Sequence, residues 1–233
     1  MNYSRILLKL SGESLGKDGV DGKSLMQVAK EIVAVNKKGI AIAIVIGGGN
    51  IWRFRDNKNL TTLPRVHSDY LGMLATVMNG TVLAAALKKL GVKAKAFSAV
   101  KAPDIVEKYS PVAAKKILAK GGVAVLAGGT GKPFVTTDTA AAMRAIETKC
   151  DRILKATNVD GVYSADPRKS KSAKLLKELD YKTAIKKQFG VMDVKAFALL
   201  AKAKIPLTVF NFGKKGLLLK AAQGQNVGTI ISS

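Results

Sequence analysis

Short apolar runs alternate with segments of helical periodicity along this chain, and this alternation limits the folds open to it. Residues 40–46 and 123–127 are apolar almost throughout, as in strands that are covered on both faces. Between such runs, apolar residues recur at helical spacing, most clearly over residues 25–38 and 70–90. Strands that alternate with helices predict a mostly parallel sheet with helices on both faces. We therefore expect an α/β fold, a three-layer α/β/α sandwich.

The length of 233 residues is enough for one substantial core, and the chain contains no internal repeat, low-complexity tract or linker. We expect a single domain over residues 1–233. Further strands are expected at residues 6–10, 92–97, 152–156, 207–211 and 228–231, and further helices at residues 139–148, 183–187, 193–203 and 215–222. Another helix is expected to open at Ser110-Pro111, with serine at the cap and proline in the first position.

The charge is strongly unbalanced, with 39 Lys and Arg against 16 Asp and Glu and a formal net charge of +23. Such a charge suits a nucleic-acid binder. The lysines are scattered, however, and aromatic residues make up only 6% of the chain. We favour a solvated basic surface that serves an anionic small substrate, with nucleic acid not required.

The number of cysteines and the length of the apolar runs indicate where in the cell the protein is expected. The single cysteine, Cys150, excludes an intramolecular disulfide. No apolar run approaches the roughly 20 residues of a membrane helix, and the start does not look like a signal peptide. We expect a cytoplasmic protein without a membrane partner.

Three predicted strands lead into loops that are rich in small residues. The strand at residues 6–10 precedes Ser11 and Gly12, the next ends at residues 47–49, and a third enters residues 128–138. Ligands of open parallel sheets lie at the carboxyl ends of the strands, so these loops should converge on one crevice. In the third loop, glycines permit close approach of a ligand, and Thr137 or Asp138 is expected to cap the next helix. An ordinary strand-to-helix turn is the alternative for this loop taken alone.

Several familiar sites are not supported by the spacing. A Walker A loop is approached at residues 22–24, but Lys17 stands where the upstream glycine is required. The dinucleotide fingerprint Gly-x-Gly-x-x-Gly fails in both glycine loops. His67, the only histidine, and Cys150 lack partners at ligand or triad spacing, and we interpret both as structural. What remains is glycine loops, cations and aspartates, the groups used for phosphoryl transfer.

Five segments carry a specific resemblance. They are KLSGE at residues 9–13, IGGGNIWR at 46–53, DYLGMLATVMNG at 69–80, GTGKPFVTTD at 129–138 and KATNVDGVYSADP at 155–167. In this order they resemble the bacterial uridylate kinases of the amino acid kinase superfamily, over nearly the whole chain. The first, fourth and fifth segments are shared in looser form by aspartokinases and acetylglutamate kinases. Residues 72–80 and the Thr-Gly-x-Pro-Phe form of the fourth segment are typical of uridylate kinases.

The resemblance implies an amino acid kinase-like fold and transfer of the γ-phosphoryl group of ATP to UMP, giving UDP and ADP, in pyrimidine nucleotide synthesis. It also implies Mg²⁺ bound with ATP rather than by protein residues, a homohexamer, and inhibition by UTP. Activation by GTP stays open, because the loop at residues 16–22 is shorter than the glycine-rich loop associated with GTP activation and differs in composition.

The resemblance also implies roles for individual residues. Lys9, Arg53 and Asp138 are expected to be catalytic, with Lys9 at the transferred phosphoryl group. Asp138 is expected to orient Lys9, with Lys155 as a second candidate partner, rather than to abstract a proton. The expected ATP-binding residues are Lys9, Leu10, Ser11, Gly12, Gly49, Arg53, Thr157, Asn158, Tyr163 and Asp166. The expected UMP-binding residues are Gly48, Asp69, Thr130, Gly131, Lys132, Pro133, Phe134, Val135, Thr136 and Thr137. No residue is assigned to a metal.

Two residues and two rival functions stay open. Lys155 is either an ordinary strand-end lysine or a functional cation, and Glu13 is interpreted as structural. The attacking phosphate oxygen is already ionised at neutral pH, so no general base is needed. A carboxylate kinase of the same superfamily is one rival, against which Asp69 and the Thr-Gly-Lys-Pro-Phe loop argue. A nucleic-acid-binding regulator that uses the +23 charge is the other.

Overall fold

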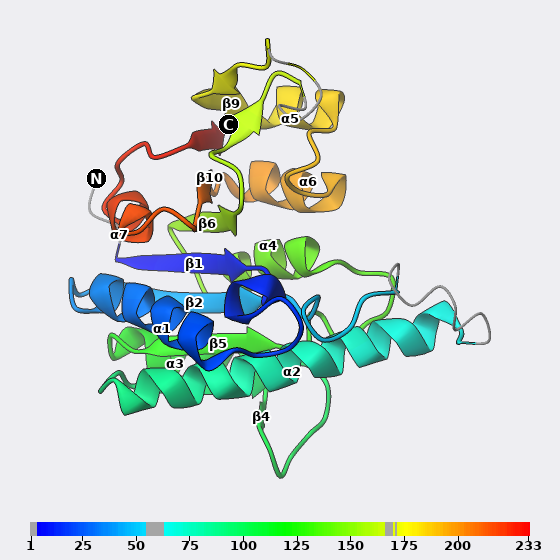
Figure 1. Cartoon of the computed structure of the whole chain (residues 1–233), viewed down its shortest axis with the longest axis vertical. Coiled ribbons are helices and arrows are strands. Elements are labelled where there is room, and N and C mark those ends of the chain that lie inside the picture. The colour runs from blue at the N-terminus through cyan, green and yellow to red at the C-terminus, as the bar shows by residue number, and fades with distance from the viewer. Residues whose placement is uncertain (1–3, 55–62, 166–169, 171) are drawn as a thin grey trace.

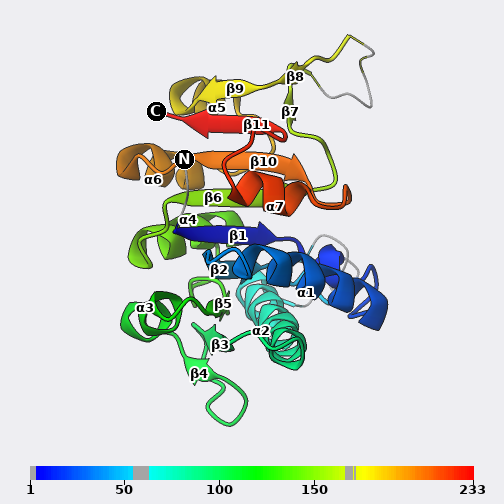
Figure 2. The ribbon, with the colours of Figure 1, turned by 90° about the vertical axis from the view of Figure 1, so that its left-hand side faces the viewer.

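The computed structural model describes residues 4–54, 63–165, 170 and 172–233, and within them it contains a nine-stranded sheet between two layers of helices (Figures 1 and 2). The strands follow the order β4-β3-β5-β2-β1-β6-β10-β11-β9, and every pairing is parallel except that of β10 with β11. The expected three-layer α/β/α sandwich with a mostly parallel sheet is therefore confirmed.

The sheet consists of β1 (Arg5–Leu10), β2 (Ala41–Ile46), β3 (Ala94–Ser98), β4 (Glu107–Lys108), β5 (Val123–Ala127), β6 (Arg152–Thr157), β9 (Glu178–Asp180), β10 (Leu207–Asn211) and β11 (Thr229–Ser232). The strands β7 (Val162–Tyr163) and β8 (Leu175–Leu176) form a separate antiparallel pair. The helices are α1 (Gly22–Asn36), α2 (Arg65–Lys89), α3 (Pro111–Ala119), α4 (Thr137–Glu147), α5 (Tyr181–Lys187), α6 (Val194–Ala203) and α7 (Leu217–Ala222), with a 3₁₀ turn η1 at Gly12–Leu15.

Each predicted strand and helix is present, and the differences lie at the ends. Helix α1 begins at Gly22, because the Asp21 carboxylate caps it by accepting from the Lys23 and Ser24 amides. The predicted caps of α4, Thr137 and Asp138, are wrong. Thr136 is the cap, and its hydroxyl accepts from the Thr139 amide. Strands β4, β7, β8 and β9 have two or three residues each, too few for a periodic signal.

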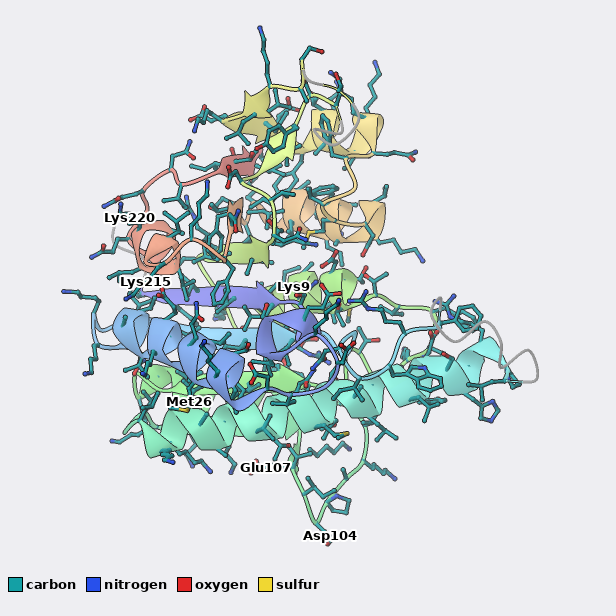
Figure 3. All side chains as sticks on the ribbon, in the orientation of Figure 1. Lys9, Met26, Asp104, Glu107, Lys215 and Lys220 are labelled. Atoms are coloured by element: carbon teal, nitrogen blue, oxygen red, sulfur yellow. The ribbon has the colours of Figure 1, made fainter. Side chains whose placement is uncertain are left out.

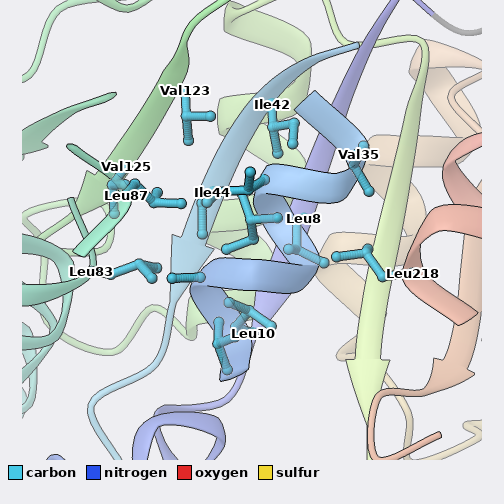
Figure 4. Packing of buried hydrophobic residues seen from close by; sticks show 14 of the residues in the cluster. Leu8, Leu10, Val35, Ile42, Ile44, Leu83, Leu87, Val123, Val125 and Leu218 are labelled. Carbon is cyan, nitrogen blue, oxygen red and sulfur yellow. The ribbon is translucent and has the colours of Figure 1, made fainter. Parts of the chain in front are cut away.

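The two faces of the sheet bury different side chains of each strand. On β1, Ile6, Leu8 and Leu10 pack in the cluster that includes α1, α2 and α7, as Figure 4 shows for Leu8 and Leu10. Leu7 packs in the opposite cluster, with α3, α4, α5 and α6. Because side chains alternate along a strand, Lys9 lies on the same face as Leu7, the face that α4 covers.

Helix α2 is the one helix among the described residues that is long and apolar enough to cross a membrane. From the sequence we expected no apolar run long enough to cross a membrane, so this property of α2 was not anticipated. In the structure, 56% of its apolar window is buried, and the helix packs against β3 and β5. Gly80 permits this approach, since a Cβ at that position would lie 3.1 Å from Cβ of Ala127. Its buried face belongs to the core.

Ile44→Ala should lower the free energy of unfolding by about 2–5 kcal/mol, because Ile44 is fully buried in the centre of β2 and its removal leaves a cavity. Denaturant unfolding measures this change. Ile105→Ala removes the same atoms from a side chain that is 69% exposed and should change the stability by less than about 0.5 kcal/mol. Equal losses in the two variants would contradict the assignment of the core.

Candidate active site

The carboxyl ends of β1, β2 and β5 meet at one edge of the sheet, because the three strands are parallel neighbours. The loops after β1 and β2 are in contact, and the loops after β2 and β5 line the same cavity. A Cβ on Gly12 would lie 2.8 Å from the Gly47 carbonyl oxygen, and a Cβ on Gly48 would lie 2.7 Å from the Gly72 carbonyl oxygen of α2. The predicted convergence of the glycine loops on one region is confirmed.

Two lysines and one aspartate form a buried ionic cluster at this edge, and we call Lys9, Asp138 and Lys155 the ionic triad. Lys9 on β1 and Lys155 on β6 are paired in register and lie on the face covered by α4. Asp138 is in the first turn of α4, and its two carboxylate oxygens lie 2.9 Å from Lys9 Nζ and 2.6 Å from Lys155 Nζ. Lys9, labelled in Figure 3, thus lies beside the start of α4. Lys155 is therefore part of the site and not a solvated strand-end lysine.

Burial and mutual attraction set the charges of this cluster. Burial acts to raise the pKa of Asp138, but Lys9 and Lys155 together outweigh it and hold the pKa below its usual value. Burial lowers the pKa of Lys155 to about 8, and the positive charge of Lys9 adds to this effect while Asp138 opposes it. Asp138 is thus an ionised carboxylate whose two oxygens are committed to the lysines.

The first cavity, of about 720 Å³, lies between the α2 N-terminal half and the loops after β2 and β5. Seven of the residues predicted on the UMP or phosphate side line it: Gly48, Arg53, Asp69, Thr130, Val135, Thr136 and Thr137. Asp69 connects its two walls, since one carboxylate oxygen accepts from Arg65 Nε at 2.8 Å and the other from the Phe134 amide at 2.7 Å.

Four predicted UMP residues do not line this cavity. Gly131, Lys132 and Pro133 form the far side of the turn, where the Thr130 hydroxyl accepts from the Lys132 amide at 3.3 Å. The Phe134 side chain is 63% exposed, with a backbone φ of 62°. The structure therefore places only part of this segment at the cavity wall.

The second cavity, of about 430 Å³, lies between α1 and the carboxyl ends of β6 and β10. The predicted ATP residues Ser11, Thr157 and Asn158 line it. The Leu10 side chain is fully buried in the core, so only its backbone can take part in binding. Tyr163 lies in β7, outside the lining of this cavity. Asp166 lies outside the described residues.

Glu13 lies in the wall of more than one cavity, although it was not predicted to be a site residue. It lines the first and second cavities and also a third, of about 290 Å³, which Gly49 and Arg53 share. Its carboxylate forms an ion pair with Arg53. The structural interpretation of Glu13 did not foresee this position, because the segment KLSGE carries the resemblance without giving its glutamate a role.

Other lining residues were also missed. They are Trp52, Phe54, Arg65, Ser68, Gly72, Met73 and Thr76 at the first cavity, and Ser14, Ser24, Gln27, Val28, Ala156, Asn211, Phe212 and Gly213 at the second. Asn211 ends the parallel strand β10, so the rule that located the glycine loops would have found it. Ser24 and Gln27 could not be found in this way, because they lie on α1.

The loop after β5 has the geometry of an anion site. Gly128 and Gly129 both have left-handed backbone, with φ of 74° and 57°. Within the described part of the chain, the Gly129 and Thr130 amides have no hydrogen-bond acceptor. Both residues precede the N-terminus of α4, where the helix dipole favours negative charge. The free amides and Arg53, which line the same cavity, suit a phosphate ligand.

Comparisons with known proteins agree with this chemistry. Residues 4–211 match the model of the amino acid kinase family. The chain is 43% identical to the uridylate kinase of Xanthomonas oryzae pv. oryzae, over 99% of the chain and 97% of that protein. It is also 43% identical to the chloroplastic uridylate kinase PUMPKIN of Arabidopsis thaliana, over 99% of the chain and 69% of that protein.

Solved structures give the same result. The crystal structure of UMP kinase from Bacillus anthracis superposes with a TM-score of 0.96 at 35% identity, covering 100% of this chain and 97% of that one. UMP kinase from Ureaplasma parvum superposes with a TM-score of 0.93 at 36% identity, with both chains fully covered.

The Lys155 amine should titrate near pH 8, well below the 10.5 of an ordinary lysine, when followed by ¹³Cε NMR. Asp138→Asn removes the charge that favours the protonated amine, so the pKa should fall further. Lys9→Met removes a repelling cation and should raise it. A Lys155 pKa that stays at its ordinary value in all three proteins would contradict the buried ionic triad.

Proposed function

Because this chain belongs to the amino acid kinase family and, within it, to the uridylate kinases, we propose that the site described above transfers the γ-phosphoryl group of ATP to UMP. The observation that carries the proposal is the ionic triad, two members of which are adjacent in sequence to residues that line the two cavities. Lys9 directly precedes Leu10 and Ser11 on the second-cavity side, and Asp138 directly follows Thr137 on the first-cavity side.

The catalytic problem in this reaction is charge, because one phosphate anion must attack another. The attacking UMP oxygen is already ionised, so a positioned base would add little. Lys9 and Lys155 neutralise charge that spreads over the transferred phosphoryl group. Asp138 keeps both amines in place before the substrates arrive, and its depressed pKa makes it unsuited to abstracting a proton.

UMP occupies the first cavity in this proposal. Its phosphate receives hydrogen bonds from the Gly129 and Thr130 amides and from the start of α4, and Arg53 adds a positive charge. Asp69 contributes to UMP binding by accepting a hydrogen bond from the Phe134 amide, which holds the far end of the loop in place. UTP shares the uridylate part of UMP, so we propose that it inhibits by occupying the same cavity.

ATP occupies the second cavity, with Ser11, Thr157 and Asn158 along its wall and Gly12, Gly49 and Arg53 toward the phosphates. Gly12 allows the loops after β1 and β2 to pack closely at this end of the site, since any Cβ there would lie 2.2 Å from Oδ1 of Asn50. Mg²⁺ would be held by the ATP phosphate oxygens, where it neutralises charge. Asp138 is not free to bind the metal, because both of its oxygens contact lysines.

The reaction is tested by ADP formation from ATP and Mg²⁺ with UMP, CMP, AMP, aspartate or acetylglutamate as acceptor. UMP should give the strong turnover, and Lys9→Met and Asp138→Asn should each reduce kcat by about 10²–10³-fold. Lys120→Ala removes an exposed lysine at the end of α3 and serves as the matched control, with unchanged rates.

The same assay distinguishes the rivals. Turnover of a carboxylate with UMP inert would favour another kinase of the family. No turnover with any acceptor, together with steeply salt-dependent binding of DNA or RNA, would favour the nucleic-acid-binding regulator. In that case neutralising exposed lysines would weaken the binding of DNA or RNA, and Lys9→Met would leave it unchanged.

We propose a homohexamer, supported by apolar side chains that helix α2 leaves exposed. Tyr70, Leu71, Leu74 and Met78 are between 37% and 57% exposed and lie within about two turns of this helix. A row of large apolar side chains on an otherwise charged surface is typical of a contact between subunits. We also propose that the protein is cytoplasmic and that it requires neither a membrane nor a nucleic-acid partner.

Leu74→Glu should dissociate the assembly into smaller species, because it places a charge in the centre of this apolar row. Size-exclusion chromatography with light scattering measures the mass, which for the native protein should be six times 24.6 kDa. Val112→Glu is the control, since Val112 is 73% exposed on α3, and it should keep the native mass. A native protein that runs as a monomer would overturn the proposal.

A further inference from the structure

The turn at Gly128 and Gly129 is held from two sides by buried side chains that none of the roles proposed above uses. The two residues have left-handed backbone in succession, and the Gly131 amide closes the turn by donating to the Gly128 carbonyl at 2.9 Å. Glycine pairs lose much conformational entropy when they are ordered. A loop of this composition needs external contacts to hold one conformation before a ligand binds.

Thr76 on α2 makes the first contact. Its hydroxyl oxygen accepts from the Gly128 amide at 2.7 Å, and the residue is only 3% exposed. The hydroxyl proton is donated to the Met73 carbonyl at 2.7 Å. Because this single proton is already used inside α2, the hydroxyl serves as an acceptor that fixes the Gly128 peptide and not as a donor to a ligand in the first cavity.

Arg144 on α4 makes the second contact, from the opposite side of the turn. Its Nη2 donates to the Gly129 carbonyl at 3.0 Å, and its Nη1 donates to Glu147 at 2.7 Å. The guanidinium lies 3.9 Å from the centroid of the Tyr109 ring, and the Tyr109 hydroxyl donates to Glu147 at 2.5 Å. Arg144 is 5% exposed, so this guanidinium is already held in place in the free protein.

We propose that Thr76 and Arg144 are positioning residues that clamp the Gly128-Gly129 turn, so that the Gly129 and Thr130 amides are presented to the uridylate phosphate. This inference rests on the proposed function, because it assumes that a nucleoside monophosphate occupies the first cavity. The contacts on Gly128 and Gly129 come from different helices and engage opposite ends of the turn. Their effect is to remove the ordering cost from phosphate binding.

Thr76 offers a matched pair of variants. Thr76→Val keeps the shape of the side chain and removes the acceptor for the Gly128 amide, whereas Thr76→Ser keeps the hydroxyl and removes a methyl group. UMP binding can be followed by the fluorescence of Trp52, the only tryptophan, which lines the first cavity. Thr76→Val should weaken UMP binding about tenfold, and Thr76→Ser should stay within about twofold of the native protein. The KM for ATP should stay within about twofold in both.

Arg144→Lys provides a second, independent variant, which keeps the positive charge but lacks the planar fork that reaches Glu147 and Gly129 together. It should also weaken UMP binding about tenfold while leaving the KM for ATP within about twofold. Thermal unfolding verifies that each variant is folded, and if one of them does not fold, the other decides.

Equal effects of Thr76→Val and Thr76→Ser on UMP binding would overturn the clamp. Parallel losses in the affinity for UMP and the KM for ATP would also overturn it. So would a native UMP affinity in both Thr76→Val and Arg144→Lys. Failure of the proposed function has a different signature. In that case the native protein itself would show neither a UMP-dependent change in Trp52 fluorescence nor turnover of UMP.

Discussion

The attraction of one carboxylate for two buried amines is the interaction on which the rest of this structure depends. Lys9 and Lys155 face each other across neighbouring strands, and two desolvated cations in that arrangement repel each other. Asp138 offsets the repulsion, and loss of one partner would leave uncompensated charge in a buried site. The register of β1 with β6 and the starting point of α4 must therefore both be correct for the triad to form.

The capping of α4 shows how the chain keeps Asp138 available. An aspartate near the start of a helix commonly caps it, but here the Thr136 hydroxyl accepts from the Thr139 amide instead. Thr136 and Thr139 are in turn held by Asp193, the cap residue of α6, which accepts from both hydroxyls. A threonine cap, supported by a second helix, thus leaves the Asp138 carboxylate to the two lysines.

Much of the site was predictable from sequence, because parallel strands place their carboxyl ends together. Glycines after two strands and Lys9 near the end of a third indicated one phosphate-binding region, and the structure places these strand ends side by side at one edge of the sheet. The contact of Lys9 with Asp138 was expected, but the role of Lys155 stayed open and the position of Glu13 was not foreseen, because each depends on an ion pair with a residue of another segment. Their place in the site follows from strand order and from the ion pairs that they make.

The sequence by itself determined the layers of the fold, the strand ends that carry the site and the family, because periodicity and motif order are local properties of the chain. Only the tertiary structure decided that both lysines meet the same carboxylate. Lys9 is separated from Asp138 and Lys155 by more than one hundred residues of chain, and the contact of the three depends on the order β2-β1-β6 and the packing of α4 on that face. The same holds for Thr76 and Arg144, whose contacts with the Gly128-Gly129 turn come from helices on opposite faces of the sheet.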